Sequence, residues 1–232
     1  MLRNPQTAQK GFSLIELMVA MLISLFALAA IISLLTNNLA YGRSSIDMLK
    51  LNQEMRTAMD IISDDLRRAG YWNNTQSMLG NSTVSNPYSF PTLPVTINTA
   101  ADCITFSYDR DNTSNTPAAN EIFGFALSNN AIVTGFPDDT INGCDDISSW
   151  NTVSNPNSIR ITSLSFQIIN PTVTTGSNAH QFTSDGGLVC VREIRIRIAA
   201  NLVKDTTVKQ SLEKTIRLRN DEIRRAPATS CA

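Results

Sequence analysis

The feature that most constrains this sequence is an apolar run from Phe12 to Leu35, in which Glu16 is the one ionisable side chain. About 20 apolar residues are enough for a helix to cross a bilayer, so we expect residues 12–35 to form a transmembrane helix. The preceding residues 1–10 carry basic side chains and no acid, and the run lacks the small-residue cleavage site of a secretory signal. By the positive-inside tendency, the short basic end stays in the cytoplasm and the long polar remainder is exported.

Glu16 is costly inside this run, because a carboxylate at the centre of a transmembrane helix costs about 2.5 to 3.5 kcal/mol on insertion scales and normally marks a functional pairing. One alternative is that Glu16, only about one turn inside the run, reaches the membrane edge. The other starts from Gly11, a small residue after a basic one, which could be a processing site. Cleavage there would give Phe12 a free α-amino group, and a neighbouring chain shifted along the helix axis could present that amine to Glu16.

The residues from Gly11 to Leu17, Gly-Phe-Ser-Leu-Ile-Glu-Leu, resemble the cleavage and N-methylation motif of type IV prepilins and type II secretion pseudopilins. The resemblance implies that an inner-membrane prepilin peptidase cuts after Gly11 and methylates the new amine of Phe12. It also implies that Glu16 serves assembly. Residues 64–72, Asp-Asp-Leu-Arg-Arg-Ala-Gly-Tyr-Trp, resemble the helix end of PilW-type minor pilins.

These resemblances imply a minor pilin that helps to initiate or complete a type IV pilus, with prepilin peptidase and other minor and major pilins as partners. The chain would be held in the bacterial inner membrane with its head in the periplasm before entering the pilus. Major subunits usually have a proline midway along the apolar helix, whereas this chain has none from Gln6 to Tyr71. Two alternatives stay open: a minor pseudopilin of the J type from a type II secretion system, and a membrane-anchored exported domain without an assembly role.

After the apolar run, residues 46–70 predict an amphipathic continuation of the helix, so that one helix extends from Phe12 to Ala69. Its apolar residues recur every three or four positions, which places them on one face: Met48, Leu51, Met55, Met59, Ile62, Leu66 and Ala69. Asp64 and Arg68 are spaced for an i,i+4 ion pair. Gly70 is a suitable helix stop.

The remaining residues, 71–232, predict a β-rich head. Alternating apolar residues indicate strands near 104–108, 123–127 and 131–134, and a terminal hairpin turns at Lys204 and Asp205. The alternation changes phase within 159–168 and within 189–198, which predicts a β-bulge in each. The fold class expected is α+β and pilin-like, with the helix packed on an antiparallel β-sheet head. The expected domains are a leader (1–11), the N-terminal helix (12–70) and the periplasmic head (71–232).

Four cysteines, Cys103, Cys144, Cys190 and Cys231, lie in the part expected to be exported, where disulfides persist. Three pairings are possible. We favour Cys103 with Cys144 and Cys190 with Cys231, because each pair closes a local loop. No Cys-x-x-Cys pair occurs and the one histidine is distant, so a zinc site is poorly supported.

A calcium site is the main metal alternative, since Asp109, Asp111, Asn112, Asn115, Asn120 and Glu121 offer oxygen ligands. The spacing does not fit an EF-hand loop beginning at Asp109, which needs glycine where Ser114 stands and an acid where Asn120 stands. Asx turns between two strands explain the same residues. We therefore predict no bound metal and no cofactor.

The composition also argues against catalysis and nucleic-acid binding. The chain has one histidine and shows no Ser/His/Asp set and no Gly-rich phosphate loop, so we expect no enzyme and no small-molecule substrate. Residues 186–232 hold ten basic and five acidic residues. No aromatic side chain follows Phe182 to stack on bases, so we expect a solvated basic strand face rather than a nucleic-acid partner.

Overall fold

The computed structural model describes residues 11–78, 84–89, 95–112, 117–136, 144, 150–169 and 188–224. The chain divides into two compact units, residues 1–48 (the N-terminal unit) and residues 49–232 (the head). Helix α1 (Leu14–Leu66) begins in the first unit and ends in the second without interruption. The predicted helix is therefore present, shorter by a few residues at each end than expected.

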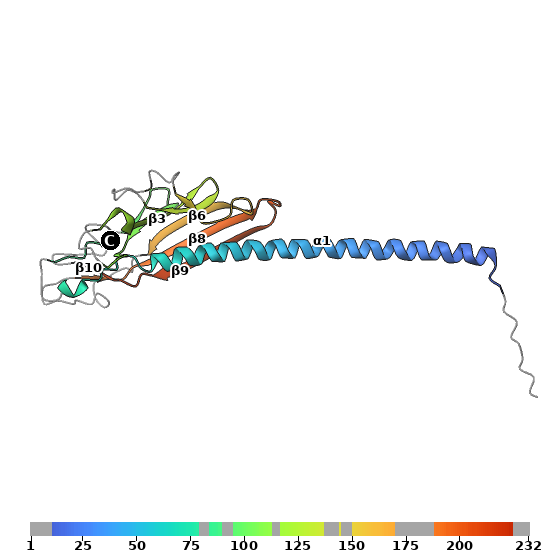
Figure 1. The fold of residues 1–232 in the computed structure, drawn as a ribbon, viewed down its shortest axis with the longest axis horizontal. Coiled ribbons are helices and arrows are strands. Elements are labelled where there is room, and N and C mark those ends of the chain that lie inside the picture. Colours follow the sequence, from blue (N-terminus) through green and yellow to red (C-terminus); the bar gives the residue numbers. More distant parts are fainter. Residues whose placement is uncertain are drawn as a thin grey trace, which may run out of the picture. The chain divides into compact units, whose positions relative to one another are not determined.

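In its described residues, the head contains three antiparallel sheets (Figure 1). The first has five strands in sequence order: β1 (Thr96–Ile97), β2 (Cys103–Ser107), β3 (Ile122–Ser128), β4 (Ala131–Gly135) and β5 (Asn151–Thr152). The second has the order β6 (Ile159–Ile169), β8 (Glu193–Leu202), β9 (Lys209–Arg217), and the third pairs β7 (Leu188–Cys190) with β10 (Glu222–Arg224). Short 3-10 helices occupy Thr75–Met78 (η1) and Ala119–Glu121 (η2). These elements confirm the α+β, pilin-like fold class.

The antiparallel β-structure expected beneath the helix is present, and it is divided into separate sheets because β6 does not pair along its length with the five-stranded sheet. It meets that sheet through bonds to turn carbonyls instead. The Phe166 N–H donates to the Ala101 carbonyl at 2.8 Å, and the Ile161 N–H donates to the Asn130 carbonyl at 2.8 Å. Both acceptor residues have a positive φ of 61°. The hydrogen bonds from β6 therefore go to turn residues and not to the edge of a strand.

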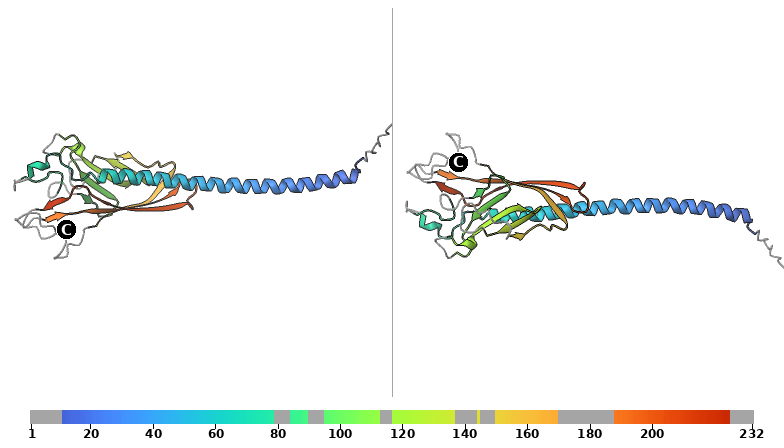
Figure 2. Two further views of the ribbon diagram at one scale, coloured as in Figure 1. Left: turned by 90° about the horizontal axis from the view of Figure 1, so that it is seen from below. Right: turned by 90° about the horizontal axis from the view of Figure 1, so that it is seen from above.

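One face of α1 forms the centre of the head's core. Figures 1 and 2 show this C-terminal part of the helix running along β8 and β9. Its buried side chains at the predicted positions are no more than 1% exposed: Leu51, Met55, Met59, Ile62 and Leu66. They pack in one cluster with strand residues that include Ile104, Phe106, Phe125, Ile132, Ile161, Leu164, Phe166, Ile194, Ile196, Ile198 and Ile216. Met48 was predicted on this face, but it is 48% exposed because it belongs to the N-terminal unit.

A single ion pair joins the polar side of this helix segment to β9 in the described structure. The Lys214 ammonium donates to Asp60 Oδ1 at 2.8 Å. This hydrogen bond, followed by the charge attraction, lowers the pKa of Asp60 below its usual value. Since the Asp60 side chain is 65% exposed, the pair contributes at most about 1 kcal/mol.

The helix ends by tightening into a final turn and then reversing at Gly70. The Arg68 and Ala69 N–H groups donate to carbonyls three residues earlier, and Gly70 has a φ of +76°, which glycine adopts without steric cost. Gly70 is thus the predicted stop. The predicted Asp64–Arg68 pair is wrong, because Asp64 pairs with Arg67 at 3.2 Å and Arg68 lies 3.8 Å from Asp65.

The two predicted bulges have different outcomes. The register of β6 against β8 shifts between Ile161 and Ser163, which confirms the first. The second, expected near Val191, is wrong: β7 ends at Cys190 and β8 begins at Glu193 in a different sheet. The chain changes sheets there through Arg192, whose carbonyl accepts a hydrogen bond from Leu218 at 3.0 Å.

A second, smaller apolar cluster lies on the five-stranded sheet around Trp150, which is 8% exposed and packs with Cys103, Ala126 and Val133. Gly124 of β3 and Gly135 of β4 are opposite each other in the ladder. A Cβ at either position would overlap the Trp150 indole. The paired glycines therefore form the flat surface on which the indole ring packs.

The same cluster contains one disulfide of the head. Cys103 and Cys144 are bonded, with Cα atoms 6.3 Å apart and a sequence separation of 41. This is one of the two favoured pairings. Cys190 is also disulfide-bonded, whereas Cys231 lies outside the described residues. The Cys190–Cys231 bond therefore stays a prediction.

We predict that Gly124→Ala destabilises the head by about 1 to 3 kcal/mol, because its methyl group would overpack Trp150. Denaturant unfolding followed by Trp fluorescence measures the change. Gly42→Ala is the control, since a Cβ there meets nothing within 4 Å, and it should leave the unfolding midpoint of the head unchanged. Equal midpoints for Gly124→Ala and wild type would show that the ring does not rest on Gly124.

We predict two crosslinked peptides in a non-reducing digest, one joining Cys103 to Cys144 and the other joining Cys190 to Cys231. Replacing both Cys103 and Cys144 by serine should cost about 4 kcal/mol for the 41-residue separation by the chain-entropy estimate. Peptide mapping by mass spectrometry checks the pairing, and urea unfolding checks the cost. A free thiol or a Cys103–Cys190 crosslink would contradict the connectivity.

Candidate functional site

The predicted processing residues lie just before α1. Gly11, Phe12 and Ser13 precede the helix and are exposed, with Phe12 at 85%. The first helical turn closes when the Leu17 N–H donates to the Ser13 carbonyl at 3.2 Å. The Gly11–Phe12 peptide bond thus lies outside regular secondary structure, where a protease can bind the backbone.

Glu16 lies in the first turn of α1 and is exposed. A carboxylate at this end of a helix is stabilised by the helix dipole and by N–H groups that lack an intrahelical acceptor. In the described part of the chain, Glu16 forms no salt bridge. Among the described residues, the helix dipole is therefore the favourable electrostatic interaction of this carboxylate.

The helix beyond Glu16 presents apolar side chains on all sides. Leu25, Phe26 and Ile31 are each more than 60% exposed, and the helix is long and apolar enough to cross a membrane. One of its hydroxyl groups is satisfied within the helix, since Ser24 Oγ donates to the Met21 carbonyl at 2.8 Å. A segment of this kind needs lipid or other apolar helices around it, because exposing apolar side chains on every side to water is unfavourable.

In the head, the structure brings three acidic side chains together that are separated in sequence. Asp109, Asp111 and Glu121 each place a carboxylate oxygen within 4.8 Å of the others. Asp109 is 3% exposed and Glu121 is 0% exposed, whereas Asp111 is exposed. Two other residues were considered as oxygen ligands for a metal ion. Asn112 accepts a hydrogen bond from the Tyr71 hydroxyl at 3.3 Å, and Asn115 lies outside the described residues.

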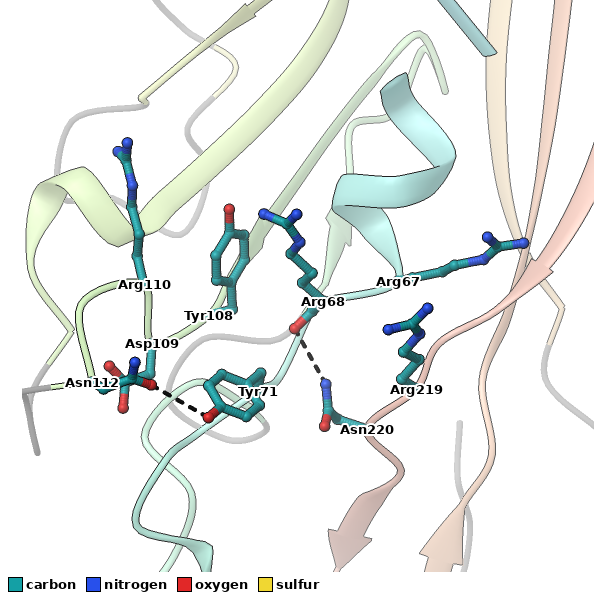
Figure 3. Close-up of a pocket in the computed structure, with 9 residues that line it drawn as sticks. All are labelled: Arg67, Arg68, Tyr71, Tyr108, Asp109, Arg110, Asn112, Arg219 and Asn220. Carbon is teal, nitrogen blue, oxygen red and sulfur yellow. Dashed lines mark hydrogen bonds between the residues drawn. The ribbon is translucent and has the colours of Figure 1, made fainter. Parts of the chain in front are cut away.

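A cavity of about 300 Å³ opens beside these acids at the C-terminal end of α1 (Figure 3). Four arginines line it: Arg67, Arg68, Arg110 and Arg219. The Arg68 guanidinium lies 5.9 Å from the centre of the Tyr108 ring, and this tyrosine raises the pKa of Arg68. Asn220 donates to the Arg68 carbonyl at 3.2 Å and thereby caps the helix end.

Sequence reasoning located the N-terminal segment and the acids but missed this cavity. Its walls come from the helix end, from residues 108–112 and from residues 219–220, and no spacing in the sequence shows that these meet. Arg67 and Arg68 are adjacent within residues 64–72, whereas Arg110 and Arg219 are far from them in sequence. The sequence therefore shows one basic pair at the helix end and gives no sign that the other two arginines join it.

Comparison with known families gives two matches. Residues 6–32 match the prokaryotic N-terminal methylation motif. Residues 44–218 match the prepilin peptidase-dependent protein B family. Comparison with curated proteins and with solved structures gave no significant match.

The two matches cover both parts of the chain. The first contains Gly11, Phe12 and Glu16, and the second contains the amphipathic part of α1 and most of the head strands. Both are pilin-like structural families rather than enzyme families, and they imply interaction with prepilin peptidase and with other pilins. The chain belongs to the prepilin peptidase-dependent protein B family.

Proposed function

We propose that this protein is a minor pilin of the PilW type that assembles with other minor and major pilins to initiate or complete a type IV pilus. The observation that carries the proposal is the exposed Gly11–Phe12 bond followed, in the first turn of an apolar helix, by the exposed carboxylate of Glu16. The match to the methylation motif over residues 6–32 supports it. The absence of proline from Gln6 to Tyr71 supports a minor rather than a major subunit.

Processing comes first in this proposal. Prepilin peptidase hydrolyses the Gly11–Phe12 bond, removes the leader (1–11) and methylates the Phe12 amine. Gly11 suits such a site because it has no side chain to exclude the protease. Residues 12–35 then hold the chain in the inner membrane, with the β-rich residues 71–232 in the periplasm.

Assembly then uses the carboxylate of Glu16. In a low-dielectric surrounding, an unpaired carboxylate is costly and an oppositely charged group a few ångströms away offsets that cost. The new Phe12 amine of a neighbouring subunit supplies this charge. Because Glu16 is exposed and belongs to the N-terminal unit rather than to the head, we place its role between chains rather than in folding.

We predict that Gly11→Leu blocks processing, because a branched side chain would occupy the position next to the scissile bond. The precursor should accumulate in the inner membrane, and mass spectrometry of the purified chain should find residues 1–10 still attached. Gly42→Leu is the matched control, since Gly42 also has open space around it, and it should be processed normally. Complete cleavage of the Gly11→Leu protein would contradict the assigned processing site.

We predict that Glu16→Gln and Glu16→Val are both cleaved and stable but are recovered poorly in sheared pili. Glutamine keeps the shape while removing the charge, and valine also removes the lipid cost of the carboxylate. Ser24→Ala is the control, because the hydroxyl it removes bonds within its own helix, and its incorporation should match wild type. Immunoblots of sheared and cell-bound fractions measure the partition.

The paired variants separate three explanations. If polarity alone matters, Glu16→Gln is incorporated and Glu16→Val is not. Normal recovery of both variants in pili would disprove the charge pairing. Absence of the wild-type protein from sheared pili would favour the J-type pseudopilin or an anchored domain without an assembly role.

A further inference from the structure

The carboxylate cluster of Asp109, Asp111 and Glu121 (the acid cluster) is not explained by pilus assembly. It lies in the head, between the end of β2 (Cys103–Ser107) and the start of β3 (Ile122–Ser128). One oxygen from each side chain lies within 4.8 Å of the other two. Three carboxylates this close repel one another strongly unless a cation or shared protons reduce their charge.

Burial raises the free-energy cost of an unpaired carboxylate at Asp109. Its side chain is 3% exposed, and Oδ2 accepts one hydrogen bond, from the Asn73 N–H at 3.1 Å. Within the described part of the chain, the buried Oδ1 has no hydrogen-bond partner. A buried polar atom without a partner is rare in folded proteins and often marks an ion or water position.

Glu121 is satisfied by donors that hold its carboxylate in place. Oε2 accepts from the Tyr88 hydroxyl at 2.8 Å and from the Ala118 N–H at 2.9 Å. Oε1 accepts from the Arg110 N–H at 3.0 Å. Since a carboxylate has about four acceptor positions, Oε1 keeps one lone pair for a further ligand.

Among the described residues, neither Asp109 nor Glu121 forms a salt bridge. In Figure 3 the Arg110 side chain extends away from Asp109. No described arginine or lysine therefore lies within salt-bridge distance of either buried acid.

We propose that the acid cluster binds one calcium ion. Calcium takes six to eight oxygen ligands at 2.3–2.6 Å, so two ligands on opposite sides of the ion are about 4.6 to 5.2 Å apart. The 4.8 Å limit within the cluster fits this sphere. Because both lone pairs of Glu121 Oε2 already accept hydrogen bonds, the three carboxylates supply three to five ligand oxygens, and water can fill the remaining positions on the exposed side, at Asp111. Magnesium needs opposite ligands only about 4.0 to 4.2 Å apart in a strict octahedron.

Calcium here would brace the end of the helix against the five-stranded sheet. The Asp109 N–H donates to the Tyr71 carbonyl at 2.9 Å, and Asp109 Oδ2 accepts from Asn73. Both partners belong to the segment that follows α1. An ion on the other side of the Asp109 carboxylate would join that segment to η2 through Glu121.

The test uses the full chain in a non-ionic detergent, stripped of metal by a chelator and then dialysed. Calorimetric titration with calcium chloride at physiological ionic strength should show one ion bound per chain. Asp111→Asn should weaken binding by about tenfold or more, because it removes one charged ligand. Since Asp111 is exposed, this variant should fold. Asp64→Asn, which neutralises an exposed acid elsewhere in the head, should bind like wild type.

Thermal unfolding gives an independent readout, because a ligand that binds only the folded state raises the unfolding midpoint by mass action. Calcium should raise the midpoint of wild type and of Asp64→Asn, and should raise that of Asp111→Asn less. A flat titration, unchanged binding by Asp111→Asn, or an equal response to magnesium would each overturn the assignment. So would a midpoint that depends on pH but not on calcium, which would indicate shared protons.

Discussion

The head depends above all on one face of helix α1. Five side chains on that face, Leu51, Met55, Met59, Ile62 and Leu66, are each at most 1% exposed. Burying a large apolar side chain contributes about 1.5 to 3 kcal/mol, so the five together provide on the order of 10 kcal/mol as an upper estimate. The exposed Asp60–Lys214 pair on the same segment is worth a small fraction of that. Apolar packing therefore fixes the helix on the sheets, and the ion pair only adds to it.

The same helix meets opposite solvation requirements along its length. In the head, α1 has one apolar face and one polar face, whereas before Met48 it exposes apolar side chains in every direction. The change in pattern coincides with the boundary between the two units at residues 48 and 49. It also explains why Met48 was assigned to the core from periodicity alone, because its spacing continues the face beyond the point where the head ends.

Local patterns predicted the elements well, and long-range juxtapositions poorly. The helix, the Gly70 stop and the β6 bulge follow from spacing, φ preference and a change of phase, which are all properties of neighbouring residues. The division into separate sheets does not, because the phase change within residues 189–198 looks the same for a bulge and for the break between β7 and β8, which lie in different sheets. Nor does the glycine pair beneath Trp150, since Gly124, Gly135 and the indole meet only after β3 and β4 pair. For the acid cluster, the residue spacing does not match an EF-hand. It also does not show that η2 places Glu121 close to Asp109.

The end of α1 is where the separate parts of the head are joined. Asn220 donates to the carbonyls of Arg68 and Ala69, which lie at a helix end where carbonyls have no intrahelical donor, and the Arg68 carbonyl also accepts from the Tyr71 N–H at 3.0 Å. The Gly70 N–H donates to the Ser107 carbonyl at 2.8 Å, so β2 holds the residue that reverses the chain. A pull along the helix is thus resisted by bonds to both the five-stranded sheet and the segment after β9, in addition to the apolar face. Because these bonds lie in the head and Glu16 lies in the N-terminal unit, a substitution at Glu16 removes none of the contacts that hold the head together.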